Sequence, residues 1–135
     1  MLRWLRRRRA AALLSGAPAV RRLKSYSSAG GYVYQYFYEG RRPEERGREP
    51  GVEYVFSVTA DRRSWFPVSV FLSRSAVRQW EAGHGRTLND TEWYAVAKMS
   101  LFQAFDERPN PEALHEEVRV RAADLEYILE RLGLD

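Results

Sequence analysis

Seven residues decide the fold: Tyr32-Val33-Tyr34-Gln35-Tyr36-Phe37-Tyr38. Aromatic and β-branched side chains favour β-strands. Because successive side chains of a strand point to opposite faces, the four tyrosines share one face and the other three residues share the second. The stretch therefore predicts a sheet, and it raises the question of what covers the tyrosine face.

Two further strands are expected downstream. Residues 53–59 and 65–72 have strand composition, and residues 60–64 between them form a turn. Pro67 has no N–H donor and favours an edge position or a bulge. The three segments predict an antiparallel meander. Residues 39–51 are charged and contain several prolines and glycines, so they predict a mobile loop between the first two strands.

The hydrophobic period then changes from two residues to 3.6, which is typical of helices. Ser73 can cap a helix over 74–82 that ends at Gly83. Asn89 and Glu92 have the spacing of a capping box, which predicts a helix over 90–105. A short strand over 117–121 and a helix over 123–132 complete the chain, although 118–132 could instead form one helix. The order predicts an α+β domain: a three-stranded antiparallel meander with a possible short fourth strand, packed by two to three helices on one sheet face.

The first 38 residues contain no acidic residue, and eight of the chain's 22 basic residues lie before Glu39. This Arg-rich segment, interspersed with Leu and Ala, is typical of a mitochondrial transit peptide. The prediction is a cleaved leader over 1–27, with the cut between Tyr26 and Ser27, followed by one domain over 28–135. Three alternatives remain: a secretory signal, a nucleic-acid arm, and a bacterial-type cytoplasmic protein with a misassigned start. The interrupted apolar core argues against the first.

Composition excludes several classes of chemistry. The chain has no cysteine, so it has no disulfide, thiol nucleophile or cysteine-ligated metal. No window of about 20 apolar residues could cross a membrane. Residues 28–135 carry 14 basic and 18 acidic residues, a net charge of −4 that makes nucleic acid an improbable partner. Arginines outnumber lysines by 20 to two, which a GC-rich genome explains without any recognition of anions.

The first candidate site is the tyrosine face with the neighbouring basic residues. It could form an adaptable protein interface or stack unpaired bases, or it could simply pack under helices. The interface candidates are Tyr32, Tyr34, Tyr36, Tyr38, Arg41 and Arg42.

The second candidate is the glycine-flanked turn with His84 and Arg86, which could hold a ligand or an anion. Its glycine and its neighbouring cap residue also have ordinary structural explanations. The second histidine, His115, lies 31 residues away with no metal-binding spacing, so no metal or cofactor is expected. No phosphate-binding or nucleophile motif is present.

The sequence therefore favours a non-enzymatic accessory subunit or assembly component of the mitochondrial matrix that binds other proteins. The alternatives are a small enzyme or ligand-binding domain that uses His84 and Arg86, and an RNA-binding protein of the mitochondrial ribosome.

Overall fold

The computed structural model describes residues 14–133 as a five-stranded sheet with three α-helices. The strands are β1 (Lys24–Ser27), β2 (Val33–Arg46), β3 (Glu49–Thr59), β4 (Phe66–Ser73) and β5 (Val118–Val120), and they lie in that order across the sheet. All neighbours are antiparallel except β4 and β5, which are parallel. The α+β class is confirmed, but the sheet has five strands where a three-stranded meander with a possible fourth was predicted.

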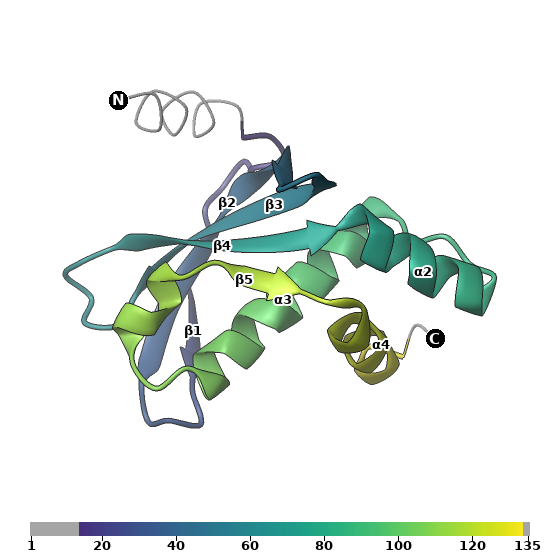
Figure 1. Ribbon diagram of the computed structural model, residues 1–135. Helices are drawn as coiled ribbons and strands as arrows, with labels where there is room; N and C mark the ends of the chain where they lie inside the picture. Colours follow the sequence, from purple (N-terminus) through teal and green to yellow (C-terminus); the bar gives the residue numbers. More distant parts are fainter. Residues whose placement is uncertain (1–13, 134–135) are drawn as a thin grey trace.

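The helices are α2 (Arg74–His84), α3 (Asp90–Glu107) and α4 (Ala122–Arg131), and a 3-10 helix, η1, covers Pro111–His115. α3 runs obliquely along the sheet, and α2 and α4 lie side by side at one end (Figure 1). The predicted caps are confirmed: Ser73 accepts from Ala76 N, and Asn89 with Glu92 forms a capping box. α2 continues past the predicted stop, because Gly85 rather than Gly83 takes the left-handed cap, with φ 61°.

One core lies between the sheet and the helices. The inner face of the sheet, defined by Tyr34, Phe56 and Val70, packs on side chains of all three helices. The ring of Tyr34 stacks on Phe105 of α3, with 4.4 Å between centroids. Tyr36 meets the same helix at Phe102, so helices of this chain cover the middle of the tyrosine face.

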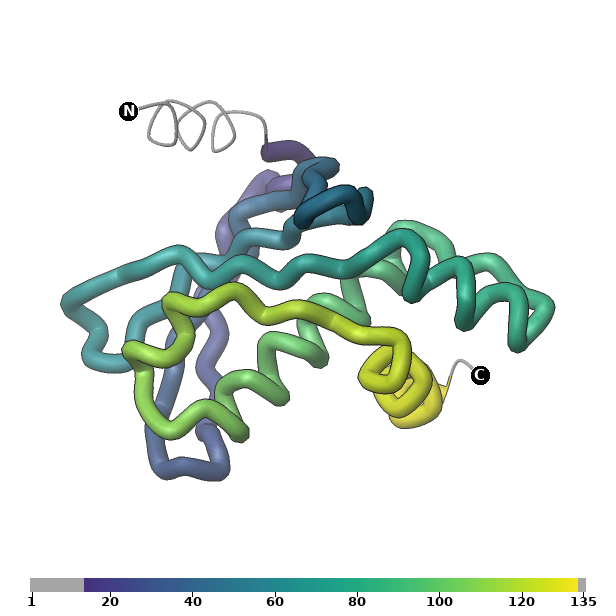
Figure 2. Tube along the Cα trace, viewed as in Figure 1, coloured from purple at the N-terminus to yellow at the C-terminus, as the bar shows by residue number. Residues whose placement is uncertain are grey.

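The predicted mobile loop over 39–51 is wrong. Most of it is strand, because β2 and β3 pair as far as Arg46 and Glu49 around a two-residue turn. The turns at the two ends of β2 therefore lie at opposite ends of the sheet (Figure 2). Opposite charges meet across the hairpin: Arg42 Nη2 lies 2.6 Å from Glu53 Oε1. These pairs replace the hydrophobic pattern by which strands are usually recognised.

The alternative that merged 118–132 into one helix is also wrong. Val118 and Val120 pair with Val70 and Leu72 and bury their side chains, and α4 begins only at Ala122.

The predicted leader contributes a strand to the domain. β1 pairs with β2, so that Tyr26 lies opposite Tyr34. Tyr26 stacks on Phe102 with 4.5 Å between centroids, and its hydroxyl donates to Asp106 Oδ2 at 2.7 Å. Residues 1–13 of the predicted leader lie outside the described residues. A cut between Tyr26 and Ser27 would pass through β1.

Candidate functional site: a cationic cleft with tyrosine walls

A cleft of about 380 Å³ lies between β2 and the N-terminal half of α3, and residues 16–24 form its rim. Its aromatic lining consists of Tyr36, Phe37 and Tyr38 from β2 and Tyr94 from α3. Tyr38 and Tyr94 lie 4.8 Å apart between ring centroids. The volume falls within the range of about 300–1,000 Å³ that is usual for small-molecule sites.

Four cations line this cleft: Arg22, Lys24, Arg41 and Lys98. The only acidic residue in the lining is Asp90, whose Oδ2 lies 3.9 Å from Arg41 Nη2. The balance of positive charge inside a partly desolvated cleft favours an anion there.

The two lysines of the cleft are the only lysines in the chain. Lys24 lies on β1 and Lys98 on α3, and their amines are close enough to interact directly. Burial and the neighbouring Lys24 hold the pKa of Lys98 below its usual value. Two like charges held together without an acid between them would be relieved by a bound anion.

Backbone contacts fix the rim of the cleft. Ser15 and Arg41 exchange two backbone hydrogen bonds of 2.8 Å. Gly40 sits under this contact with φ +139°, and a Cβ there would lie 2.8 Å from Ser15 O. Arg21 pairs with Glu39 at 3.0 Å and lies over the Phe37 ring. The rim is therefore built onto the sheet by several independent contacts.

The tyrosines lining the cleft remain neutral at ordinary pH. Burial raises the pKa of Tyr36 and of Tyr94. Burial also raises the pKa of Tyr38, although the Arg41 guanidinium opposes the rise. Their hydroxyls can therefore donate hydrogen bonds to an anion.

The structure brings only some of the predicted interface residues together. Tyr36, Tyr38 and Arg41 line the cleft. Tyr34 is fully buried and Tyr32 is 36% exposed at the start of the strand, so a partner could touch only the second of these. Arg42 lies instead on the outer face of the sheet, opposite Glu53.

His84 and Arg86 make contacts within the domain. The His84 ring stacks on Trp80 at 4.3 Å, and its Nε2 lies 2.9 Å from Glu126 Oε1, which ties α2 to α4. Arg86 pairs with Glu92 of the capping box. These contacts explain both side chains without a ligand. Among residues 14–133, no group of three or more His, Asp or Glu could hold a metal ion.

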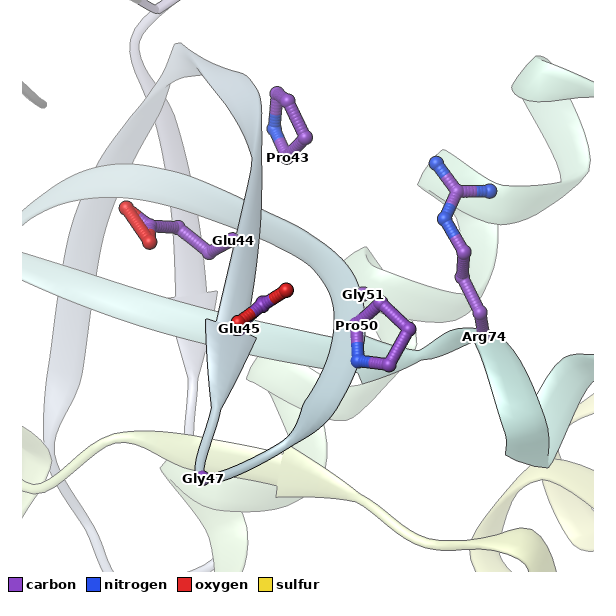
Figure 3. A pocket seen from close by; sticks show the side chains of 7 residues that line it. All are labelled: Pro43, Glu44, Glu45, Gly47, Pro50, Gly51 and Arg74. Atoms are coloured by element: carbon purple, nitrogen blue, oxygen red, sulfur yellow. The ribbon is translucent and has the colours of Figure 1, made fainter.

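A second hollow, of about 620 Å³, lies beside the β2–β3 hairpin (Figure 3). It is lined by Pro43, Glu44, Glu45, Gly47, Pro50, Gly51 and Arg74. Glu44 already lies within 4 Å of Arg42 and Arg46, and Arg74 lies over the Trp93 ring. This hollow offers fewer convergent groups than the cleft.

Sequence reasoning missed Lys24, Tyr94 and Lys98. The available signal was the scarcity of lysine itself, because the sequence contains two lysines and 20 arginines.

Comparison with protein-family models, with curated proteins and with solved structures found no match to this chain. None of the helices in the described part of the chain is long and apolar enough to cross a membrane. The functional argument therefore rests on the cleft and on the exposed surfaces of the domain.

Proposed function

We propose that this domain binds a small organic anion in the cleft between β2 and α3. One observation carries the proposal: both lysines of the chain, from segments 74 residues apart, meet in a cleft that also holds two arginines and one acid. A carboxylate or phosphate placed between the amines would accept charge-assisted hydrogen bonds, which are worth about 1.5–3 kcal/mol each.

The walls of the cleft indicate the body of the ligand. Tyr36, Tyr38 and Tyr94 present ring surface, and aromatic rings pack favourably against other flat groups. A ligand with one anionic group and one aromatic ring would use both the cations and the tyrosines. Phenyllactate is a suitable probe because it has a carboxylate and a ring.

Calorimetric titration tests this function. Phenyllactate should bind the wild-type protein, and 2-phenylethanol, which lacks the carboxylate, should bind at least about tenfold more weakly, since tenfold corresponds to 1.4 kcal/mol. Lys24→Met and Lys98→Met should each weaken phenyllactate by about tenfold or more. Arg63→Met, at an exposed turn outside the cleft, is the matched control. Equal affinity of the two probes, or of the lysine variants and the wild type, would contradict the proposal.

A second candidate function is protein binding as an accessory subunit, and the outer face of the sheet favours it. The buried side chains of all three helices belong to the core on the inner face. On the outer side, Val33 is 48% exposed, and Trp65 is 42% exposed and packs on Phe37. Exposed apolar groups of this kind are frequent at protein interfaces.

Native-gel migration tests this second function. The protein should co-migrate with a large assembly in a mitochondrial lysate, and Val33→Ser with Trp65→Ser should release it. Tyr127→Ser, at an equally exposed aromatic residue on α4, is the control. Migration of the wild type as a monomer would rule out stable membership of a complex.

The mitochondrial location is part of the same proposal, with one change to the processing site. Because Ser15, Arg21 and β1 are built into the domain, we propose that processing occurs before Ser15 rather than at Tyr26. A GFP fusion of residues 1–35 tests targeting, and diffuse cytosolic signal would exclude it. N-terminal sequencing of the mature protein tests the cut, and a start at Ser27 would overturn the revised position.

A further inference from the structure

We infer that the Lys98 amine is a nucleophile that forms an imine with a 2-oxo carboxylic acid bearing an aromatic ring. The inference rests on the proposed function, since it uses the same cleft to hold the carboxylate. It goes further by giving one lysine a reaction rather than a charge alone.

The geometry separates the tasks of the two lysines. Lys24 comes from the edge strand β1, next to the exposed rim, whereas Lys98 lies on α3 with its Nζ 5.8 Å from the centre of the Phe102 ring. Lys98 therefore has an apolar neighbour on one side and a cation on the other. Both surroundings favour the neutral amine, which is the reactive form.

Every charged or titratable group that lines the cleft fits this division. Arg22, Lys24 and Arg41 are cations that can hold a carboxylate, and Asp90 lies toward Arg41 rather than between the lysines. The remaining groups are the tyrosine hydroxyls. Burial and Lys24 lower the pKa of Lys98, so more of its amine is unprotonated near neutral pH than for an isolated lysine.

The chemistry balances without a further reagent. The Lys98 nitrogen attacks the carbonyl carbon and forms a C–N bond, and the carbonyl oxygen gains a proton to give a carbinolamine. The hydroxyl then leaves with a second proton as water, and the nitrogen retains a double bond to carbon. No electrons are exchanged with a third molecule. The neutral hydroxyls of Tyr36 and Tyr94, which line the same cleft, can pass protons to and from the leaving oxygen.

The two-lysine composition makes the test unambiguous. The full chain is incubated with phenylpyruvate and cyanoborohydride, which reduces an imine to a stable secondary amine, and the modified peptides are identified by mass spectrometry. The adduct should form on Lys98 at least about tenfold faster than on Lys24 or the N-terminal amine. Lys98→Arg should abolish it, and Lys24→Met should slow it at neutral pH because the pKa of Lys98 then rises. Circular dichroism confirms that the variants are folded.

Phenyllactate distinguishes failure of this inference from failure of the proposed function, because it has no carbonyl. It should bind and slow the labelling of Lys98. Binding of phenyllactate with no preferred label on Lys98 would overturn the imine and leave the anion site intact. Absence of phenyllactate binding would overturn both. Equal labelling of all three amines, or labelling unchanged in Lys98→Arg, would also overturn the imine.

Discussion

Lys98 is the residue on which the account depends most. Its positive charge is disfavoured in the folded protein by burial and by Lys24, and both effects disappear in the unfolded chain. The folded state therefore binds its proton less tightly than the unfolded state does. Stability should rise with pH between the lowered pKa of the folded state and the ordinary value of 10.5.

Lys98→Met should thus stabilise the protein at neutral pH. The expected gain is up to about 1 kcal/mol, since the pair lies at the edge of the domain. The gain should vanish above about pH 10.5, where the wild-type amine is neutral in both states. Urea unfolding of the two proteins across this range measures the difference. A constant difference at all pH values would mean that the charge of Lys98 is not strained.

Asp106 is the residue that fixes β1. Its two carboxylate oxygens accept from the Tyr26 hydroxyl at 2.7 Å and from Ala29 N at 2.9 Å. The hydrogen bond to Asp106, followed by burial, raises the pKa of Tyr26 to about 12. Stability from this contact should be complete below pH 10 and lost as the pH rises toward 12, because the unfolded tyrosine ionises first.

Asp106→Ala should cost about 1–3 kcal/mol of unfolding free energy at neutral pH, because two charge-assisted hydrogen bonds disappear. Thermal or urea unfolding measures this loss. Glu130→Ala, at an exposed position of α4, is the control and should change stability by less than about 0.5 kcal/mol. An equal effect of the two substitutions would show that Asp106 does not anchor β1.

At the scale of elements, the long hairpin and the helix that follows β4 make opposite demands on glycine. Gly51 lies in β3, where an added Cβ would come 2.5 Å from Leu72 O and from the Phe71 ring. Gly83 lies inside α2 with nothing within 4 Å of an added Cβ. Only the first position needs the missing side chain.

Gly51→Ala should therefore destabilise the protein, by about 1–3 kcal/mol as for an overpacked core. Gly83→Ala should stabilise it by about 0.5–1 kcal/mol, because alanine favours the helix. Denaturant unfolding of the two variants gives both signs. Similar effects of the two substitutions would contradict the close approach of β3 and β4 at Gly51.

The same elements show what the sequence could and could not predict. The strands around Tyr36 and Val58 and the caps of α2 and α3 followed from local patterns, which depend on neighbouring residues alone. The outer half of the hairpin was missed because its stability comes from cross-strand ion pairs such as Arg42 with Glu53, which leave no hydrophobic alternation. β1 was missed because only four residues form it, inside a segment with the composition of a leader.

The site was half predictable for the same reason. Tyr36, Tyr38 and Arg41 come from one strand and its continuation, so the tyrosine pattern identified them. Lys24 and Lys98 come from opposite ends of the domain, and no spacing rule connects them. Only the folded sheet, with β1 at its edge beside α3, brings the two amines together.

At the scale of the whole molecule, the account makes the segment before β2 part of the domain. Removing residues 1–13 should leave β1 and the cleft complete. Removing residues 1–26 deletes Arg22, Lys24 and Tyr26, and should cost about 3–5 kcal/mol of unfolding free energy for the lost aromatic packing alone. It should also abolish binding of phenyllactate.

Urea unfolding and calorimetry of the two truncated proteins check this expectation. Equal stability and equal affinity would show that residues 14–26 are dispensable, as a cleaved leader over 1–27 requires. Loss in the longer truncation alone would support processing before Ser15.

The central claim, that the two lysines form one anion site, can be observed directly by NMR after reductive ¹³C-methylation of the amines, which keeps their positive charge. The labelled protein should give signals for Lys24, Lys98 and the N-terminal amine only, because the chain has two lysines. During titration with phenyllactate, both lysine signals should shift and saturate with the same dissociation constant while the N-terminal signal stays in place. Lysine signals that do not move, or three signals that drift together without saturation, would contradict the claim.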